Sequence, residues 1–117
     1  MSYIEENIKT RAILVGVVTD NSAVAEEEKS LDELARLLDT AGGETFAIVM
    51  QNKSSLDPRT LIGSGKVAEI ASLCENNEIK LVIFNEELSP AQIRNLEDDI
   101  GNDVRVLETP RPSPWKA

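Results

Sequence analysis

The sequence predicts an α/β fold in which a four-stranded parallel sheet is flanked by helices, in the chain order β-α-β-α-β-α-β. Short apolar runs rich in Val and Ile alternate with segments of helical periodicity, and the connections between them are short. Hydrophobic residues make up 41% of the chain and aromatic residues only 3%, so the core must consist of Leu, Ile, Val and Ala. With 117 residues, the chain suits one domain. We expect right-handed crossovers and the strand order 2-1-3-4.

The first half of the chain contains two expected strands with a helix between them. Residues 11–18 are a continuous apolar run, which is typical of a strand covered on both faces. Ser30 and Glu33 match a capping box, so we expect a helix to begin at Ser30 and to end at the Gly42-Gly43 pair. Residues 46–50 then predict a second buried strand.

The second half supplies the remaining elements. We expect an exposed loop, a helix, a strand, a helix and a strand at residues 52–59, 66–76, 81–84, 90–99 and 103–107. The last helix has the best-defined start, because Ser89, Pro90 and Gln92 match an N-cap, a proline at the first helical position and a capping-box partner. Val15, Val17, Ile48, Val82 and Phe84 are expected to be buried.

Charge makes bulk attraction to nucleic acid unfavourable, because the formal net charge is −9. Residues 51–66 differ from the rest, since they contain three basic residues, Lys53, Arg59 and Lys66, and one acidic residue, Asp57. If the domain contacts RNA phosphates, we expect this stretch to make the contact.

The sequence also restricts the chemistry and the location of the chain. Histidine is absent, which removes the common zinc and general-base constellations, and we expect neither a catalytic nor a metal site. The single cysteine, Cys74, cannot form an internal disulfide and is expected to be buried rather than reactive. No apolar run is long enough to span a membrane, and residues 1–6 do not resemble a signal peptide, so we expect a cytoplasmic protein.

Gly63, Ser64, Gly65 and Lys66 stand where a helix is expected to begin. Backbone N–H groups and the positive end of the helix dipole favour an anion there, and Lys66 adds a full charge. The alternative is that the two glycines serve only packing, with a tight turn of positive φ. A phosphate-binding loop of the form G-x-x-x-x-G-K-[ST] is not met, because Thr60 replaces the first glycine and Val67 replaces the hydroxyl residue.

Two further groups of polar residues are open to more than one interpretation. Glu86-Glu87 and Asp20 follow two expected strands and either hold a divalent cation or, for the glutamates, favour the start of the next helix. Arg94, Asn95 and Glu97 lie on the polar side of the last helix, where they form either a solvated face or an interface.

Two segments together carry a resemblance to a known family. They are Leu61-Ile-Gly-Ser-Gly-Lys-Val-Ala-Glu-Ile70 and Glu86-Glu-Leu-Ser-Pro-Ala-Gln-Ile-Arg-Asn-Leu-Glu97. They resemble the N-terminal domain of the HflX family of ribosome-associated GTPases, where these runs occur in this order. The resemblance extends from about Arg11 to Leu107.

The resemblance implies a domain at residues 11–108, after a lead at 1–10 and before a proline-rich, disordered tail at 109–117. It implies a docking and regulatory role at the large ribosomal subunit through its rRNA, next to a helical hairpin and a G domain outside this chain. GTP and Mg²⁺ are expected only in that G domain, so the chain alone is not expected to be an enzyme. Neither a membrane nor DNA is an expected partner. The alternatives are a module that senses ATP or GTP and a stand-alone protein-interaction domain.

Overall fold

The structure, a computed structural model, describes residues 9–109 and contains one four-stranded sheet in these residues. The strands are β1 (Thr10–Val18), β2 (Gly43–Asn52), β3 (Leu81–Phe84) and β4 (Arg105–Glu108). A short 3₁₀ helix, η1 (Asn21–Ala23), precedes the helices α2 (Val24–Thr40), α3 (Ser64–Asn77) and α4 (Pro90–Ile100). All strand pairs are parallel and the order is β2-β1-β3-β4, which confirms the predicted sheet.

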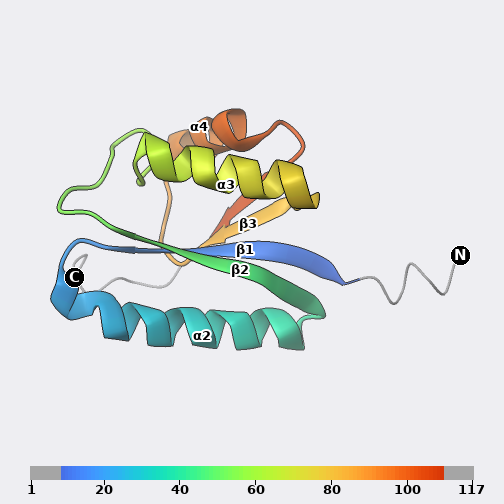
Figure 1. Cartoon of the computed structure of the whole chain (residues 1–117), viewed down its shortest axis with the longest axis horizontal. Coiled ribbons are helices and arrows are strands. Elements are labelled where there is room, and N and C mark those ends of the chain that lie inside the picture. Colours follow the sequence, from blue (N-terminus) through green and yellow to red (C-terminus); the bar gives the residue numbers. More distant parts are fainter. Residues whose placement is uncertain (1–8, 110–117) are drawn as a thin grey trace, which may run out of the picture.

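The sheet is the middle of three layers, with α3 and α4 on one face and α2 on the other (Figure 1). The larger core lies beneath α3 and α4 and contains alternate residues of the two inner strands, including Ile13, Val15, Val82 and Phe84. The smaller core beneath α2 contains Ala12, Leu14, Leu31 and Ile83. The two inner strands are thus covered on both faces, as their continuous apolar runs predict.

Helix α2 begins earlier than the sequence predicts. Its first residue is Val24, so Ser30 lies inside the helix and the expected capping box does not form. The chain turns into η1 instead, where the Asp20 side chain accepts a hydrogen bond from the Ser22 amide at 3.0 Å. Glu26 and Glu27 then place negative charge in the first turn of α2, where it is favourable.

The other end of α2 agrees with the prediction. After the helix, Gly42 adopts a φ of 93°, a conformation that most side chains disfavour. This glycine allows the chain to reverse directly into β2.

One expected core residue is not buried. Ile48 is 45% exposed, whereas Val15, Val17, Val82 and Phe84 are buried as expected. The reason is topological, because β2 is an edge strand and α2 covers only part of its width.

Helix α4 begins as the sequence predicts. The Gln92 amide donates to the Ser89 hydroxyl at 3.1 Å, and the Ser89 amide donates to the Gln92 side chain at 2.9 Å. Pro90 occupies the first helical position, where its missing N–H is not needed. The proline-rich tail predicted for residues 109–117 lies outside the described residues, except for Thr109.

We expect Ser89→Ala to lower the free energy of unfolding by about 1 kcal/mol, because an N–H of the first turn loses its acceptor. Urea denaturation measures the change. Ser72→Ala is the matched control, since Ser72 is an exposed position inside α3, where alanine is the better helix former. A loss of stability in the control that equals the loss at Ser89 would remove the capping explanation.

Candidate anion-binding site

The N-terminus of α3 is the candidate site, because it exposes backbone amides beside positive charge. Gly63 is the N-cap residue and provides no side chain to cap the helix. Its own amide donates to the Gln51 side chain at 3.0 Å. The amides of the first turn, at Ser64, Gly65 and Lys66, find no acceptor among the described residues. They point toward a position that an anion can occupy.

The packing alternative for the two glycines holds only in part. The φ of Gly63 is −70°, and among the described glycines only Gly42 has a positive φ. A Cβ added to Gly65 would meet no atom within 4 Å. The expected positive φ is therefore wrong at both glycines. Gly63 is nevertheless closely packed, because a Cβ there would lie 3.1 Å from Lys53 Nζ and 3.5 Å from Gln51 Oε1.

The three cations of the basic stretch have different surroundings. The Arg59 guanidinium forms two hydrogen bonds with the Asp99 carboxylate, at 2.9 and 3.1 Å. The Lys66 amine lies 3.3 Å from the Glu69 carboxylate. Lys53 has no ion-pair partner in the described part of the chain, and its amine lies 3.1 Å from the position of a Cβ on Gly63. The structure thus places the Lys53 amine beside Gly63, the N-cap residue of α3.

The loop before α3 is held in a fixed shape. Asp57 and Leu61 exchange two backbone hydrogen bonds, of 2.7 and 3.1 Å, and the Asp57 carboxylate also accepts from the Arg59 amide at 2.8 Å. Leu61 has a φ of 70°, which is rare for a bulky residue, and it is buried. This closed loop fixes the direction in which the chain enters α3.

Helix α4 binds the same loop through polar side chains, and the sequence analysis did not predict these contacts. Gln92 donates to the Pro58 carbonyl at 3.3 Å and Asn95 donates to the Arg59 carbonyl at 3.1 Å. Asp99, one turn further on, binds the Arg59 side chain. These α4 residues recur at helical spacing, which is the one signal in the sequence that joins them.

The predicted interface residues of α4 therefore divide into two groups. Arg94 is exposed. The Asn95 side chain donates a hydrogen bond to the loop before α3, and the Glu97 side chain accepts a hydrogen bond from the Val106 amide of β4 at 2.9 Å. Two of the three side chains thus make contacts within the domain.

The acidic residues at the ends of β1 and β3 do not form a common site. Asp20 caps η1, Glu87 is exposed, and Glu86 is only 2% exposed. Within residues 9–109 no three side chains are arranged to hold a metal ion.

A buried polar network that the sequence reasoning missed joins β3 to α2. The Asn85 side-chain amide donates to the Glu27 carboxylate at 2.8 Å and to the Ser30 hydroxyl at 2.9 Å. Ser30, expected to start the helix, thus ties its middle to the sheet.

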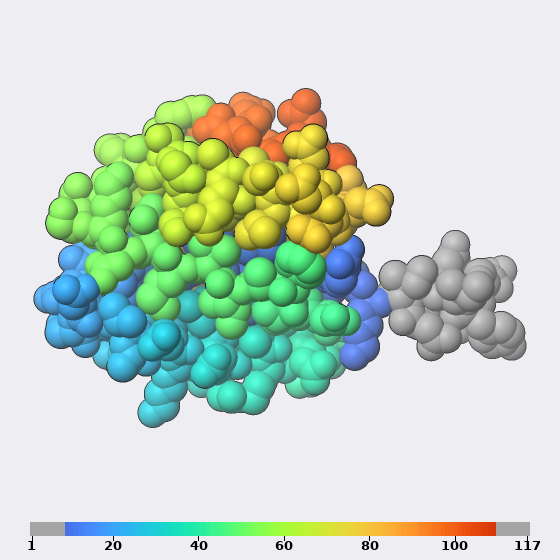
Figure 2. Space-filling model, viewed as in Figure 1, coloured from blue at the N-terminus to red at the C-terminus, as the bar shows by residue number. Residues whose placement is uncertain are grey.

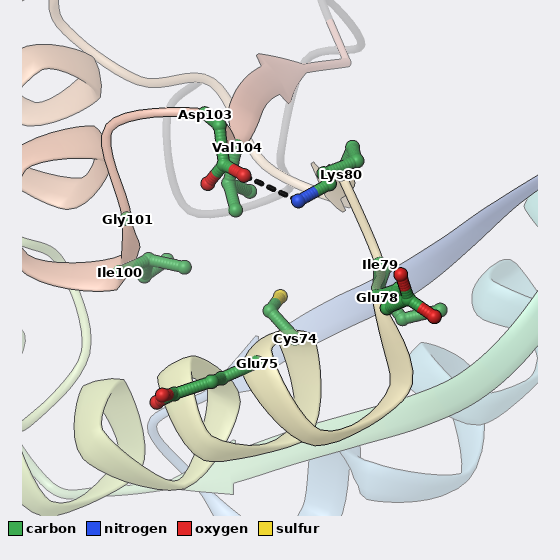
Figure 3. Close-up of a pocket in the computed structure, with 9 residues that line it drawn as sticks. All are labelled: Cys74, Glu75, Glu78, Ile79, Lys80, Ile100, Gly101, Asp103 and Val104. Atoms are coloured by element: carbon green, nitrogen blue, oxygen red, sulfur yellow. Dashed lines mark hydrogen bonds and ion pairs between the residues drawn. The ribbon is translucent and has the colours of Figure 1, made fainter.

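A separate hollow of about 330 Å³ lies at the opposite end of the sheet, where α3 and α4 end (Figure 3). Cys74 lines it, and the Lys80–Asp103 ion pair closes one side. Burial, followed by the charge of Asp103, raises the pKa of the Cys74 thiol. The hydrogen bond between Lys80 and Asp103 raises the pKa of the lysine and lowers that of the carboxyl group. These shifts keep Cys74 a thiol and hold the pair charged, which agrees with a structural role.

We expect Cys74 to react slowly with a thiol reagent such as iodoacetamide. The thiolate is the reactive form, and a raised pKa means that less of it exists at pH 8 than in the unfolded chain. Native protein should react at least about tenfold more slowly than urea-unfolded protein, and its rate should keep rising at pH values where the unfolded thiol is already ionised. Equal native and unfolded rates would contradict the burial of this thiol.

No helix within residues 9–109 has the length and apolar character needed to cross a membrane.

Comparison with known families and proteins gives one consistent result. The family model for the GTP-binding GTPase N-terminal domain matches residues 28–109. GTPase HflX of Caldanaerobacter subterraneus subsp. tengcongensis is 42% identical over 100 residues, covering 86% of this chain and 22% of that protein. GTPase HflX of Flavobacterium psychrophilum is 36% identical over 98 residues, covering 84% of this chain and 23% of that protein. The chain thus spans less than a quarter of the length of these relatives.

Solved structures share the fold. A variant of SsGBP superposes with a TM-score of 0.61 at 22% identity, covering 86% of this chain and 29% of that one. The catalytic domain of an IS607-like serine recombinase superposes with a TM-score of 0.64 at 14% identity, covering 91% of this chain and 73% of that domain. At these identities the likeness concerns the arrangement of helices and strands alone.

Proposed function

The chain belongs to the GTP-binding GTPase N-terminal family found in HflX proteins, and we propose that it is the ribosome-docking and regulatory domain of an HflX-type GTP-binding protein. In this proposal the domain binds the large ribosomal subunit. GTP and Mg²⁺ bind in a G domain outside this chain, and the chain by itself does not hydrolyse GTP. Its place of action is then the cytoplasm, where ribosomes are.

The start of α3 is the observation that supports docking to RNA. A helix N-terminus without a side-chain cap presents amides to an anion, and the Lys53 amine lies beside its N-cap residue, Gly63. Lys66 belongs to the first turn, with its amine 3.3 Å from the Glu69 carboxylate. The closed loop at residues 57–61 and its contacts with α4 hold this start in place, so little ordering is needed on binding. Phosphate contacts of this kind position a protein on RNA without reading its sequence.

A nucleotide-sensing role would use the same amides, but the neighbouring side chains favour it less. The shallow pocket beside the start of α3 is lined by Arg59, Asp57 and Asp99, and the last two carry negative charge. Arg59 is already neutralised by Asp99. A triphosphate in this pocket would therefore meet the Asp57 carboxylate and no unpaired cation of the pocket lining.

Co-sedimentation of the purified chain with isolated ribosomal subunits tests the proposal. We expect saturable binding to large subunits, weak binding to small subunits, and no GTP turnover above background. Saturable binding of ATP or GTP with no subunit binding would replace the proposal with the nucleotide sensor. The absence of both kinds of binding would favour a stand-alone protein-interaction domain.

A further inference from the structure

Strand β2 forms a long open edge of the sheet. It runs for 10 residues, whereas the opposite edge strand, β4, has only 4. The β4 edge is partly closed, because the outward amide of Val106 donates to Glu97. Proteins commonly shorten, charge or cover such edges, since unpaired backbone groups attract other strands. The β2 edge carries no charged residue over residues 46–50, and its regular stretch, Ala47–Asn52, follows a bulge at Phe46.

The outward backbone groups of β2 can be identified. The Lys53 amide donates to the Val18 carbonyl of β1 at 3.0 Å. Because backbone groups alternate in direction along a strand, the amides of Ile48 and Met50 point away from β1. No side chain within residues 9–109 accepts from either of them. Figure 2 shows β2, in green, at the surface between the α2 layer in cyan and α3 in yellow-green.

A groove follows this edge on the α2 side. It has a volume of about 550 Å³, and its lining combines the apolar side chains Leu31, Ile48 and Met50 with the carboxylates of Glu28 and Asp32. The two acidic residues stand one helical turn apart on α2, and neither has an ion-pair partner among the described residues. Ile48 is 45% exposed in the groove.

We propose that the β2 edge binds an extended, basic segment of a partner protein as a fifth strand of the sheet. The backbone of that segment pairs with the outward groups of Ile48 and Met50. Its lysine or arginine stems cover these two apolar side chains, and their charged ends reach Glu28 and Asp32. The other side chains of the segment, between these basic residues, face the α3 side of the sheet. Phe46 and Ala47 are only partly buried there, so we expect these side chains of the segment to be apolar.

A second copy of this chain fits the edge less well. It would bring another acidic α2 to the same groove, and each copy carries a formal charge of −9. The groove lies on the α2 side of the sheet, whereas α3 lies on the other side, so this proposal does not rest on ribosome binding.

Three synthetic peptides that match β2 in length test the proposal by titration calorimetry. One alternates valine and lysine, one alternates valine and glutamate, and one alternates proline and lysine. We expect only the valine–lysine peptide to bind measurably, since alternate prolines hold the peptide backbone away from the strand conformation and glutamate reverses the charge. In amide hydrogen exchange, saturation with this peptide should protect Ile48 and Met50 and leave Val106 unchanged.

Charge-reversal variants locate the site. Combining Glu28→Lys with Asp32→Lys should weaken binding of the valine–lysine peptide by about tenfold or more, because two exposed charge pairs are reversed. Asp98→Lys, an exposed position on α4, is the single-charge control and should change binding by less than about twofold. Equal affinity for the proline–lysine peptide, or self-association of the chain through Ile48 without peptide binding, would overturn the proposal.

Discussion

Phe84→Ala should lower the free energy of unfolding by about 3–5 kcal/mol, the largest effect expected of any single substitution in the core. Phe84 has no exposed surface and lies in β3, one of the two inner strands. Removal of its ring leaves a cavity between the sheet and the layer of α3 and α4, and the surrounding side chains cannot fill it because they are themselves packed. Domains of this kind are stable by only about 5–15 kcal/mol, so much of the stability is lost.

Urea denaturation followed by circular dichroism measures this change. Phe84→Leu serves as the control, since it retains most of the apolar volume and should cost about 1.5 kcal/mol or less. If the alanine variant were as stable as the leucine variant, the centre of the core would lie elsewhere.

Gly16→Ala should destabilise the domain by about 1–3 kcal/mol, although alanine is usually the better residue in a folded chain. A Cβ on Gly16 would lie 2.5 Å from Leu31 Cδ1 and 3.0 Å from Glu27 Oε2. Leu31 is only 1% exposed, so either its packed side chain must change conformation or α2 must move off β1. The crowded Glu27 Oε2 is also the atom that accepts the Asn85 hydrogen bond, so we expect that bond to be disturbed.

Gly65→Ala is the matched control for this prediction. A Cβ there meets nothing within 4 Å, and the residue is helical. We expect this variant to match or exceed the wild-type stability by up to about 1 kcal/mol. Thermal melting of both variants tests this prediction, because we expect Gly16→Ala to lower the melting temperature and Gly65→Ala to leave it unchanged or to raise it.

Much of the fold could be predicted because its signals are local. Each apolar run contains its own strand, and Ser89, Pro90 and Gln92 define the start of α4 within a few residues. The short connections between alternating strands and helices then leave few topologies, and the order 2-1-3-4 is the one observed.

The errors have physical causes that a single sequence does not display. Ser30 and Glu33 have the spacing of a capping box, but the same spacing occurs inside a longer helix, and here Asp20 starts the turn through η1. Ile48 belongs to an apolar run like that of β1, yet the edge position of β2 leaves it exposed. Burial depends on which strands become neighbours, and that is decided by the whole sheet.

The candidate site was predicted only in outline. The position of the Gly63–Lys66 segment at a helix start follows from local sequence, and the structure places it there, with α3 beginning at Ser64. The contacts that determine which cation is available are long-range. Arg59 pairs with Asp99, 40 positions away, and this leaves Lys53 as the cation nearest to the start of α3 without an ion-pair partner among the described residues.

The proposed docking role depends most directly on Lys53 and Lys66, and the salt dependence of binding to large ribosomal subunits tests it. Each phosphate contact that is lost reduces the slope of log K against log salt concentration by about one unit. The double variant Lys53→Glu/Lys66→Glu should therefore bind more weakly at low salt and show a slope shallower by about one to two units. Lys29→Glu, at an exposed lysine of α2, should match wild type in slope. A double variant with the wild-type slope and affinity would contradict phosphate binding at the start of α3.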